Sequence, residues 1–171
     1  MNRREWLAMA AAAGVAPQVA RAQDDPAAAA RDAWLFALPW VEMAATRAKV
    51  TDRGARQNRL YHRKDLAGPN DRNVTTPNND TLYSLAWIDV SKGPVSLTLP
   101  ASGTRYVSVA ILNMWTENDA VLGTRVNGGG GGTFTIVGPG AAATGEGTVR
   151  LSTPHGWVLV RTLVDGPADL E

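Results

Sequence analysis

Residues Thr75 to Val90 read TTPNNDTLYSLAWIDV, and this stretch decides the fold because a polar corner passes directly into a strand pattern. Pro77 fixes its own φ and biases the preceding residue toward extended backbone. Asn and Asp favour turns because their short side chains bond nearby backbone groups. The following run is rich in aromatic and aliphatic residues, as strands are. The stretch therefore predicts a turn that presents polar side chains at one mouth of a β-structure.

The chain beyond this stretch continues as short strand patterns with Gly- and Pro-rich connections. Residues 95–99 alternate apolar and polar side chains, as a half-buried strand does. Similar runs predict strands at residues 106–112, 133–137, 148–151 and 156–164. The five glycines of residues 128–132 are predicted to form a flexible hairpin tip, because no Gly-Lys-Ser/Thr sequence follows them as in a phosphate-binding loop. Several short strands with such turns indicate an antiparallel sandwich or barrel.

The part of the chain before the polar corner has a helical pattern. Asp25 suits an N-cap and Pro26 suits the first helical position, and an apolar face recurs at helical spacing over residues 27–49. Pro39 interrupts this pattern and should kink or divide the helix near Leu38, so we expect one helix before it and another from about Trp40 to Val50. Residues 51–73 are polar and predict a long surface loop. The expected fold is α+β, with N-terminal helices packed on an antiparallel β-sandwich or jelly-roll-like sheet.

Residues 1–22 are predicted to be an export signal peptide of the twin-arginine (Tat) type. Arg3 and Arg4 precede an alanine-rich run, and residues 19–22 end in a small-x-small cleavage pattern. The apolar run is shorter than the roughly 20 residues that span a bilayer. We therefore expect an exported protein, periplasmic or secreted, with residues 23–171 as a single β-rich domain and no membrane span.

Charge and composition argue against several classes of function. Removing residues 1–22 takes away three arginines and one glutamate, which moves the net charge from +1 to −1 and leaves no basic block. Nucleic-acid binding is therefore not expected. The chain has no cysteine, and its two histidines, His62 and His155, lack the spacing of metal ligands. No metal site is predicted, and the sequence leaves any cofactor unknown.

The candidate site residues lie at the polar corner and at three other positions. Asp80 is the one candidate catalytic residue, although Asn and Asp side chains at this corner can equally serve only the turn. An arginine inside the apolar run 157–161 is expensive to bury unpaired, so it should meet a carboxylate or face a ligand anion. Of the tryptophans, one lies in a loop-like segment, whereas Trp34, Trp40, Trp87 and Trp157 fall at core-like positions. The predicted ligand-binding residues are Asn78, Asn79, Tyr83, Arg105, Trp115 and Arg161.

Several short motifs along the chain carry a family resemblance. They are Leu38-Pro39-Trp40-Val41-Glu42-Met43, Pro77-Asn78-Asn79-Asp80-Thr81-Leu82-Tyr83-Ser84, Trp87-Ile88-Asp89-Val90, Gly138-Pro139-Gly140 and Asp165-Gly166. Together they resemble the bacterial domain of unknown function 1254 (DUF1254) family from about Ala33 to Leu170. The resemblance implies a β-rich fold. It also implies a second domain of the DUF1214 type, which we expect on a separate chain or in the remainder of a longer protein.

Three functions remain open at this level. The leading hypothesis is an exported ligand-binding or assembly domain that works with a second β-domain. The alternative is a hydrolase or lyase on a polar substrate, with Asp80 as acid or base and Arg105 or Arg161 stabilising charge. A third, plainer role is the scaffold of a homo-oligomer.

Overall fold

The structure is a computed structural model that describes residues 25–72, 76–142 and 144–170. The chain divides into two compact units, residues 1–38 and 39–171. The predicted signal peptide lies outside the described residues. Within the part that is described, no helix is both long enough and apolar enough to cross a bilayer.

Helix α2 (Pro26–Thr51) is one helix, not two, so the expected division at Pro39 was wrong. A proline removes one backbone hydrogen bond from a helix, but the residues on either side here keep helical geometry. The predicted N-cap is confirmed, because the Ala27 N–H donates to Asp25 Oδ1 over 2.9 Å. Trp34 and Trp40 are 56% and 47% exposed, so their prediction as core residues was also wrong.

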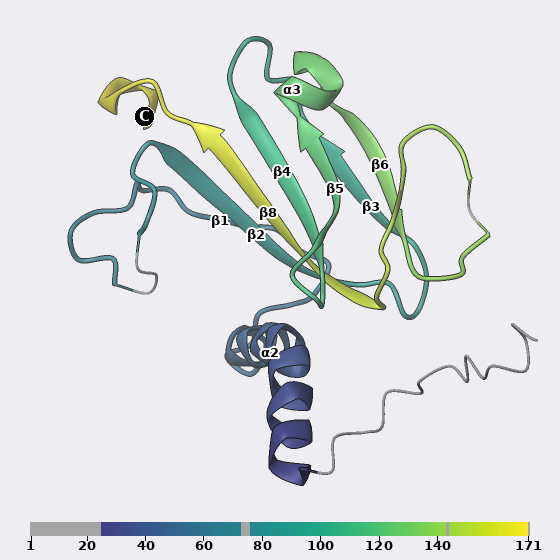
Figure 1. Cartoon of the computed structure of the whole chain (residues 1–171). Helices are drawn as coiled ribbons and strands as arrows, with labels where there is room; N and C mark the ends of the chain where they lie inside the picture. Colours follow the sequence, from purple (N-terminus) through teal and green to yellow (C-terminus); the bar gives the residue numbers. More distant parts are fainter. Residues whose placement is uncertain (1–24, 73–75, 143, 171) are drawn as a thin grey trace, which may run out of the picture. The chain divides into compact units, whose positions relative to one another are not determined.

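The described strands form two sheets (Figure 1). The five-stranded sheet has the order β1-β2-β8-β4-β5 and is antiparallel throughout. The three-stranded sheet has the order β3-β6-β7, with β6 and β7 parallel. The predicted α+β class is confirmed. The strands are β1 (Tyr61–His62), β2 (Thr81–Asp89), β3 (Val95–Leu99), β4 (Val107–Asn113), β5 (Asn118–Gly123), β6 (Gly132–Val137), β7 (Thr148–Arg150) and β8 (His155–Leu163).

The glycine run is not a hairpin tip, because it connects the two sheets. It follows β5 of one sheet through α3 (Thr124–Asn127) and η1 (Gly128–Gly130) and leads into β6 of the other. The Gly129 carbonyl accepts hydrogen bonds from the N–H groups of Ser102 and Gly103, at 2.8 and 3.0 Å. A Cβ on Gly129 would lie 1.7 Å from the Gly103 oxygen, so this crossing requires glycine.

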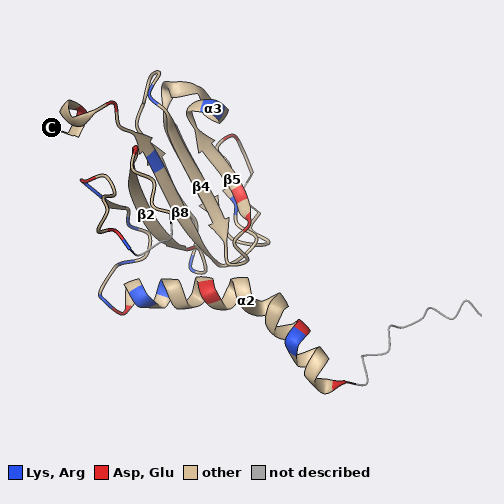
Figure 2. Cartoon of the chain, turned by 60° about the vertical axis from the view of Figure 1, so that its left-hand side comes forward, with Lys and Arg blue, Asp and Glu red and all other residues tan. Residues whose placement is uncertain are grey.

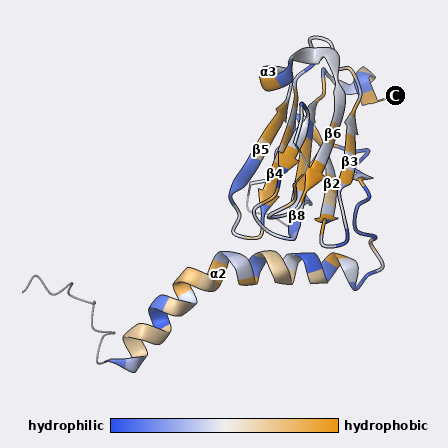
Figure 3. Cartoon of the chain, turned by 90° about the vertical axis from the view of Figure 1, so that its right-hand side faces the viewer, coloured by the Kyte–Doolittle hydropathy of each residue, from blue (hydrophilic) through white to orange (hydrophobic). Residues whose placement is uncertain are grey.

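The core lies between the inner faces of the two sheets. Alternate residues of each strand point into it, which is why the strands carry the hydrophobic colour in Figure 3. Both sheets contribute fully buried side chains, among them Val109, Ile111 and Val158 from the larger sheet and Ile136 from the smaller one.

The outer face of the five-stranded sheet has a second, smaller apolar cluster at one end. Trp87 of β2 and Trp157 of β8 are register partners, and their rings stack 5.4 Å apart and 8° from parallel. Met43, in the part of α2 that belongs to residues 39–171, packs against Trp87 and Met114. This end of the outer face is therefore buried, and the strand ends farther along β2 and β8 define the site described next.

Candidate functional site

The polar corner forms the turn that its sequence predicts. The Asp80 N–H donates to Asn78 Oδ1 over 2.9 Å, which is an Asx turn. The Val164 N–H donates to the Asp80 carbonyl over 3.0 Å and joins the corner to the end of β8. The Asp80 side chain itself is exposed. These contacts match the turn-forming interpretation of Asn78 and Asp80.

The register of β2 and β8 places the key side chains opposite one another. Tyr83 pairs with Arg161 and Leu85 with Leu159, and all four side chains are half-buried on the outer face. The Arg161 guanidinium carbon lies 5.7 Å from the centre of the Tyr83 ring, a cation–π distance. Residues far apart in the sequence thus form one continuous surface.

A polar hollow of about 390 Å³ lies at the corner end of this surface. Four of the residues that line it are Asn78, Asp80, Tyr83 and Arg161, each predicted from the sequence. The other residues that line it are Thr76, Thr81, Tyr106 and Leu163. Thr81 is only 4% exposed, and its Oγ1 has no hydrogen-bond partner among the described residues. We refer to this space as the polar hollow.

Two further hollows follow the polar hollow along the strands. The central hollow, about 480 Å³, shares Asn78, Tyr83 and Arg161 with it and adds Leu159 and other apolar side chains. The helix-side hollow, about 210 Å³, shares Leu85 and Trp157 with the central one and reaches Val50 of α2. We call the three together the outer-face groove. Its lining changes from polar to apolar along β2 and β8.

An ion pair on the preceding loop forms part of the wall of the central hollow. Arg63 Nη2 lies 3.1 Å from Asp71 Oδ1, and both residues line the hollow. Asp71 Oδ2 also accepts the Gly68 N–H over 2.8 Å. That backbone hydrogen bond, followed by the nearby Arg63 charge, lowers the pKa of Asp71. The charges of Arg63 and Asp71 in the wall of the central hollow are thus already paired with each other.

Arg105 is not part of the groove. Its guanidinium holds the C-terminal turn η2 (Pro167–Leu170) through both oxygens of Asp169, with Nη2 at 2.6 Å from Oδ1. It also donates to the Leu163 carbonyl over 2.8 Å. Its hydrogen bonds hold the pKa of Asp169 down to about 2, and the same pair raises the pKa of Arg105. The structure therefore gives this predicted ligand-binding residue a structural partner.

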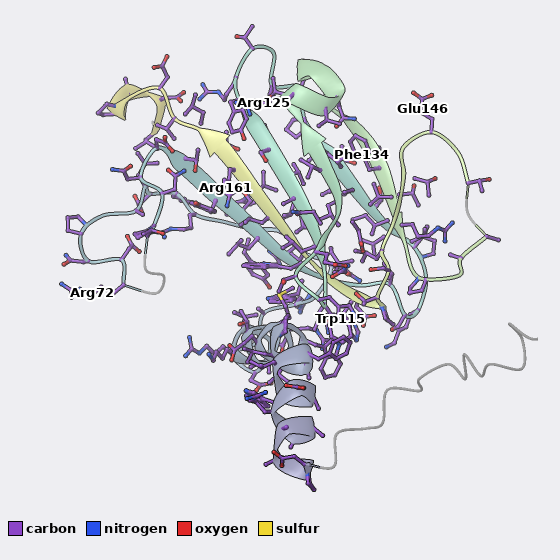
Figure 4. All side chains as sticks on the ribbon, viewed as in Figure 1. Arg72, Trp115, Arg125, Phe134, Glu146 and Arg161 are labelled. Atoms are coloured by element: carbon purple, nitrogen blue, oxygen red, sulfur yellow. The ribbon has the colours of Figure 1, made fainter. Side chains whose placement is uncertain are left out.

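Trp115 and Asn79 also lie apart from the groove lining. Trp115 sits in the β4–β5 turn, and Figure 4 places it toward the opposite end of the sheet from Arg161. The register pairs Asn113 with Gly156 and Ser108 with Arg161, so about 17 Å of strand separates the two positions. Asn79 is exposed at the corner and lines none of the three hollows. The predicted site is thus reduced to Asn78, Asp80, Tyr83 and Arg161.

Two histidine contacts were missed by the sequence analysis. His62 Nδ1 lies 2.7 Å from Ser84 Oγ, across the β1–β2 pair. His155 Nδ1 lies 3.5 Å from Asp89 Oδ1, and burial, with the nearby Arg47 charge, lowers the pKa of His155. No described acidic side chain orients His62, so the Ser84–His62 pair lacks the third member of a hydrolytic triad. Within the described ranges, no three His, Asp or Glu side chains are grouped as metal ligands.

Comparisons with known proteins support the family resemblance. The family model "Protein of unknown function (DUF1254)" matches residues 57–171. Four chains of solved structures match. The VPA0106 protein from Vibrio parahaemolyticus does so with a TM-score of 0.67 and 20% identity, over 81% of this chain and 33% of that one. An uncharacterized protein from Burkholderia cenocepacia has a TM-score of 0.47 and 15% identity, over 86% of this chain and 41% of that one.

No curated protein matches the chain. The likeness to the VPA0106 protein extends to the fold, and the present chain spans about a third of that protein's length, 33%.

Proposed function

The chain belongs to the DUF1254 family of proteins of unknown function, and from this premise we propose that it is an exported ligand-binding domain that works with a second β-domain. The proposed binding surface is the outer face of the five-stranded sheet. One observation carries the proposal, namely that the outer-face groove follows β2 and β8 with Arg161 half-buried in it and in no ion pair with a described residue.

The two outer faces of the sandwich differ in chemistry. The outer face of the three-stranded sheet carries small hydroxyl side chains that suit water, namely Ser96, Thr98, Thr133 and Thr135, all exposed. The outer face of the five-stranded sheet carries Tyr83, Leu85 and Leu159, with Val121 and Leu163 as much as 44% and 37% exposed. Apolar side chains gathered on one face favour a binding surface over a solvated one.

A second domain is the proposed partner for the rest of this face. The VPA0106 protein has the same fold over a third of its length, which supports the idea that the fold works beside further domains. We expect the partner to be a DUF1214-type domain on a separate chain or in a longer form of this protein. Self-association through the same face, giving a homo-oligomer, is the competing arrangement.

The export part of the proposal rests on the N-terminal sequence. The twin arginines at residues 3 and 4 and the small-x-small pattern before Gln23 support cleavage in that region. Mass spectrometry of the protein secreted or exported by a bacterial host would find a new N-terminus at residue 23. A protein that keeps Met1 and remains in the cytoplasm would contradict export.

The enzymatic alternative retains one supporting observation. Asp80 and Arg161 line the same polar hollow, as an acid or base and a charge-stabilising group would. Asp80 is exposed, however, and its backbone N–H already serves the Asx turn. A hydrolase or lyase would lose turnover when Asp80 is changed to Asn, whereas a binding domain would not depend on that carboxylate.

The partner part of the proposal is tested by measuring affinity between this protein and a DUF1214-type domain from the same genome. Val121→Glu places a charge on the exposed outer face of β5 and should weaken binding by about tenfold or more. Thr98→Glu places the same charge on the opposite outer face and should leave the affinity unchanged. Equal effects of both variants would contradict the proposed surface, and sedimentation of the protein alone would reveal self-association instead.

A further inference from the structure

Arg161 differs from Arg105 and Arg63 in having no acidic partner among the described residues. It is the one Lys or Arg within β2, β4 and β8, which are otherwise nearly free of charge, as Figure 2 shows. Arg105 and Arg63 each have an aspartate partner, whereas Arg161 forms no ion pair with any residue that the structure describes. A half-buried guanidinium loses part of its hydration free energy, and an oppositely charged partner compensates this loss best. Arg161 is therefore available to bind an anion.

The side chains around Arg161 add hydrogen-bond donors. Tyr83 and Tyr106 line the polar hollow, and neither hydroxyl has a hydrogen-bond partner in the described part of the chain. Asn78 also lines the hollow, and it uses its Oδ1 in the Asx turn, so its Nδ2 group remains as a donor. A guanidinium flanked by hydroxyl and amide donors is suited to an oxyanion.

The rest of the groove narrows the ligand class. Beyond Arg161 the central hollow is lined by Leu85, Leu159 and Trp157, and the helix-side hollow continues along Trp157 to α2. From Arg161 to Trp157 the strand runs about 13 Å at the usual rise per residue. Asp80 at the rim of the polar hollow disfavours a dianion such as phosphate more than a monoanion. These features together fit a ligand that has a head with a single negative charge and an apolar body.

We propose that the outer-face groove binds a carboxylic acid with an extended apolar body. The carboxylate accepts hydrogen bonds from Arg161 and the neighbouring hydroxyl groups, and the body lies over Leu85 and Leu159 toward Trp157. This inference rests on the proposed function, since it names the ligand of the same binding surface. It also gives Asp80 the role of a rim charge and not of an acid or base.

The test uses calorimetric titration of the protein with five probes that separate the contribution of the charged head from that of the apolar body. Octanoate should bind, and acetate should bind far more weakly because it lacks the body. Each methylene that is half removed from water should tighten binding about twofold across acetate, butanoate and octanoate. Octanol, without the charge, should bind at least about tenfold more weakly than octanoate. Octylammonium should not bind better than octanol.

Three variants assign the effect to the groove. Arg161→Gln should weaken octanoate binding by about tenfold or more and leave octanol binding unchanged. Arg105→Gln, which removes an arginine outside the groove, should leave octanoate binding unchanged. Asp80→Asn should tighten octanoate binding by about twofold, because it removes a nearby negative charge. Thermal unfolding of each variant confirms that it is folded at the temperature of the titration.

Specific outcomes would overturn the inference. Octanoate binding that survives Arg161→Gln would rule out the proposed role of Arg161. Octanoate binding that is lost in Asp80→Asn would rule out the role of Asp80 as a repelling rim charge. Stronger binding of octylammonium than of octanoate would assign the groove to cations held by Asp80. If neither octanoate nor octanol binds while the DUF1214-type domain still does so in a Val121-dependent manner, the ligand inference is wrong and the proposed function stands.

Discussion

Replacing Thr81 by valine should stabilise this protein, although most substitutions of buried residues destabilise. Thr81 is 4% exposed, and its Oγ1 is buried with no hydrogen-bond partner among the described residues. Burying such a hydroxyl without a partner costs about 1–3 kcal/mol. Valine keeps the β-branched shape that a strand favours and replaces the hydroxyl by a methyl group. We expect the free energy of unfolding to rise by about 1 kcal/mol and Tm by about 2–4 °C.

The same chemical change at Thr153 should have the opposite sign. Thr153 is 8% exposed, its Oγ1 accepts the Met114 N–H over 3.0 Å, and it donates to the His155 carbonyl over 2.6 Å. Valine there removes both hydrogen bonds and leaves a buried N–H without a partner. The expected loss in the free energy of unfolding is about 2–4 kcal/mol. Thr153→Val is therefore a matched control for Thr81→Val.

Urea denaturation followed by tryptophan fluorescence measures both variants, because Trp87 and Trp157 are stacked beside the core. Unchanged m-values would show that the two variants expose the same surface on unfolding. A Thr81→Val variant that is less stable than the wild type by more than about 0.5 kcal/mol would show that the hydroxyl has a partner, and would refute this account of the buried Thr81 hydroxyl.

Three further predictions concern local contacts and pH. Asn58 has a φ of 59° and exchanges two hydrogen bonds with the Asp89 backbone, at 2.8 and 3.0 Å, so Asn58→Ala should cost about 2–3 kcal/mol in urea denaturation. Asn58→Gly, which adopts the same positive φ without strain but also lacks both side-chain hydrogen bonds, should cost less than Asn58→Ala. Because burial lowers the pKa of His155 below 6.5, the unfolded state binds more protons there, so stability should fall as pH drops below 6.5 and His155→Gln should flatten that slope. The Arg105 hydrogen bonds that hold the pKa of Asp169 near 2 stabilise the C-terminal turn above pH 3.8. The protection of residues 165–170 against hydrogen exchange, relative to the intrinsic exchange rate at each pH, should therefore fall as pH falls from 3.8 toward 2. This fall should occur only when Arg105 is present.

Much of the sandwich was predictable because alternating side chains reveal a half-buried strand. The pattern of Val95–Leu99 predicted β3 with its observed bounds. The strand β5 was missed because it is an edge strand that begins with Asn118 and Asp119 and pairs with β4 through an irregularity at Ile111 and Leu112. Polar side chains at that end bond one another, as the contact of Asn113 Nδ2 with Asp119 Oδ1 at 3.0 Å shows. Periodicity carries no information about such a network.

The candidate site was predictable only in part, for a related reason. The polar corner follows from local turn chemistry, and the Asx turn at Asn78 bears it out. The meeting of Tyr83 with Arg161 depends on the register of two strands far apart in the sequence, and no local pattern specifies that register. Arg105 and Arg161 both appeared as candidate anion-binding groups, and only the folded chain shows that Asp169 has already paired with the first.

The central claim, that the outer face of the five-stranded sheet is the binding surface, is tested most directly by amide chemical-shift mapping. The protein would be labelled with ¹⁵N and titrated with octanoate and then with the DUF1214-type domain. If the claim holds, octanoate shifts amides of β2 and β8 around Tyr83, Leu159 and Arg161, and the DUF1214-type domain shifts amides of the same sheet that include Val121 of β5. Thr98 and Thr133 on the opposite outer face stay unchanged in both titrations. Shifts that gather on β3 and β6, with β2 and β8 unchanged, would contradict the claim.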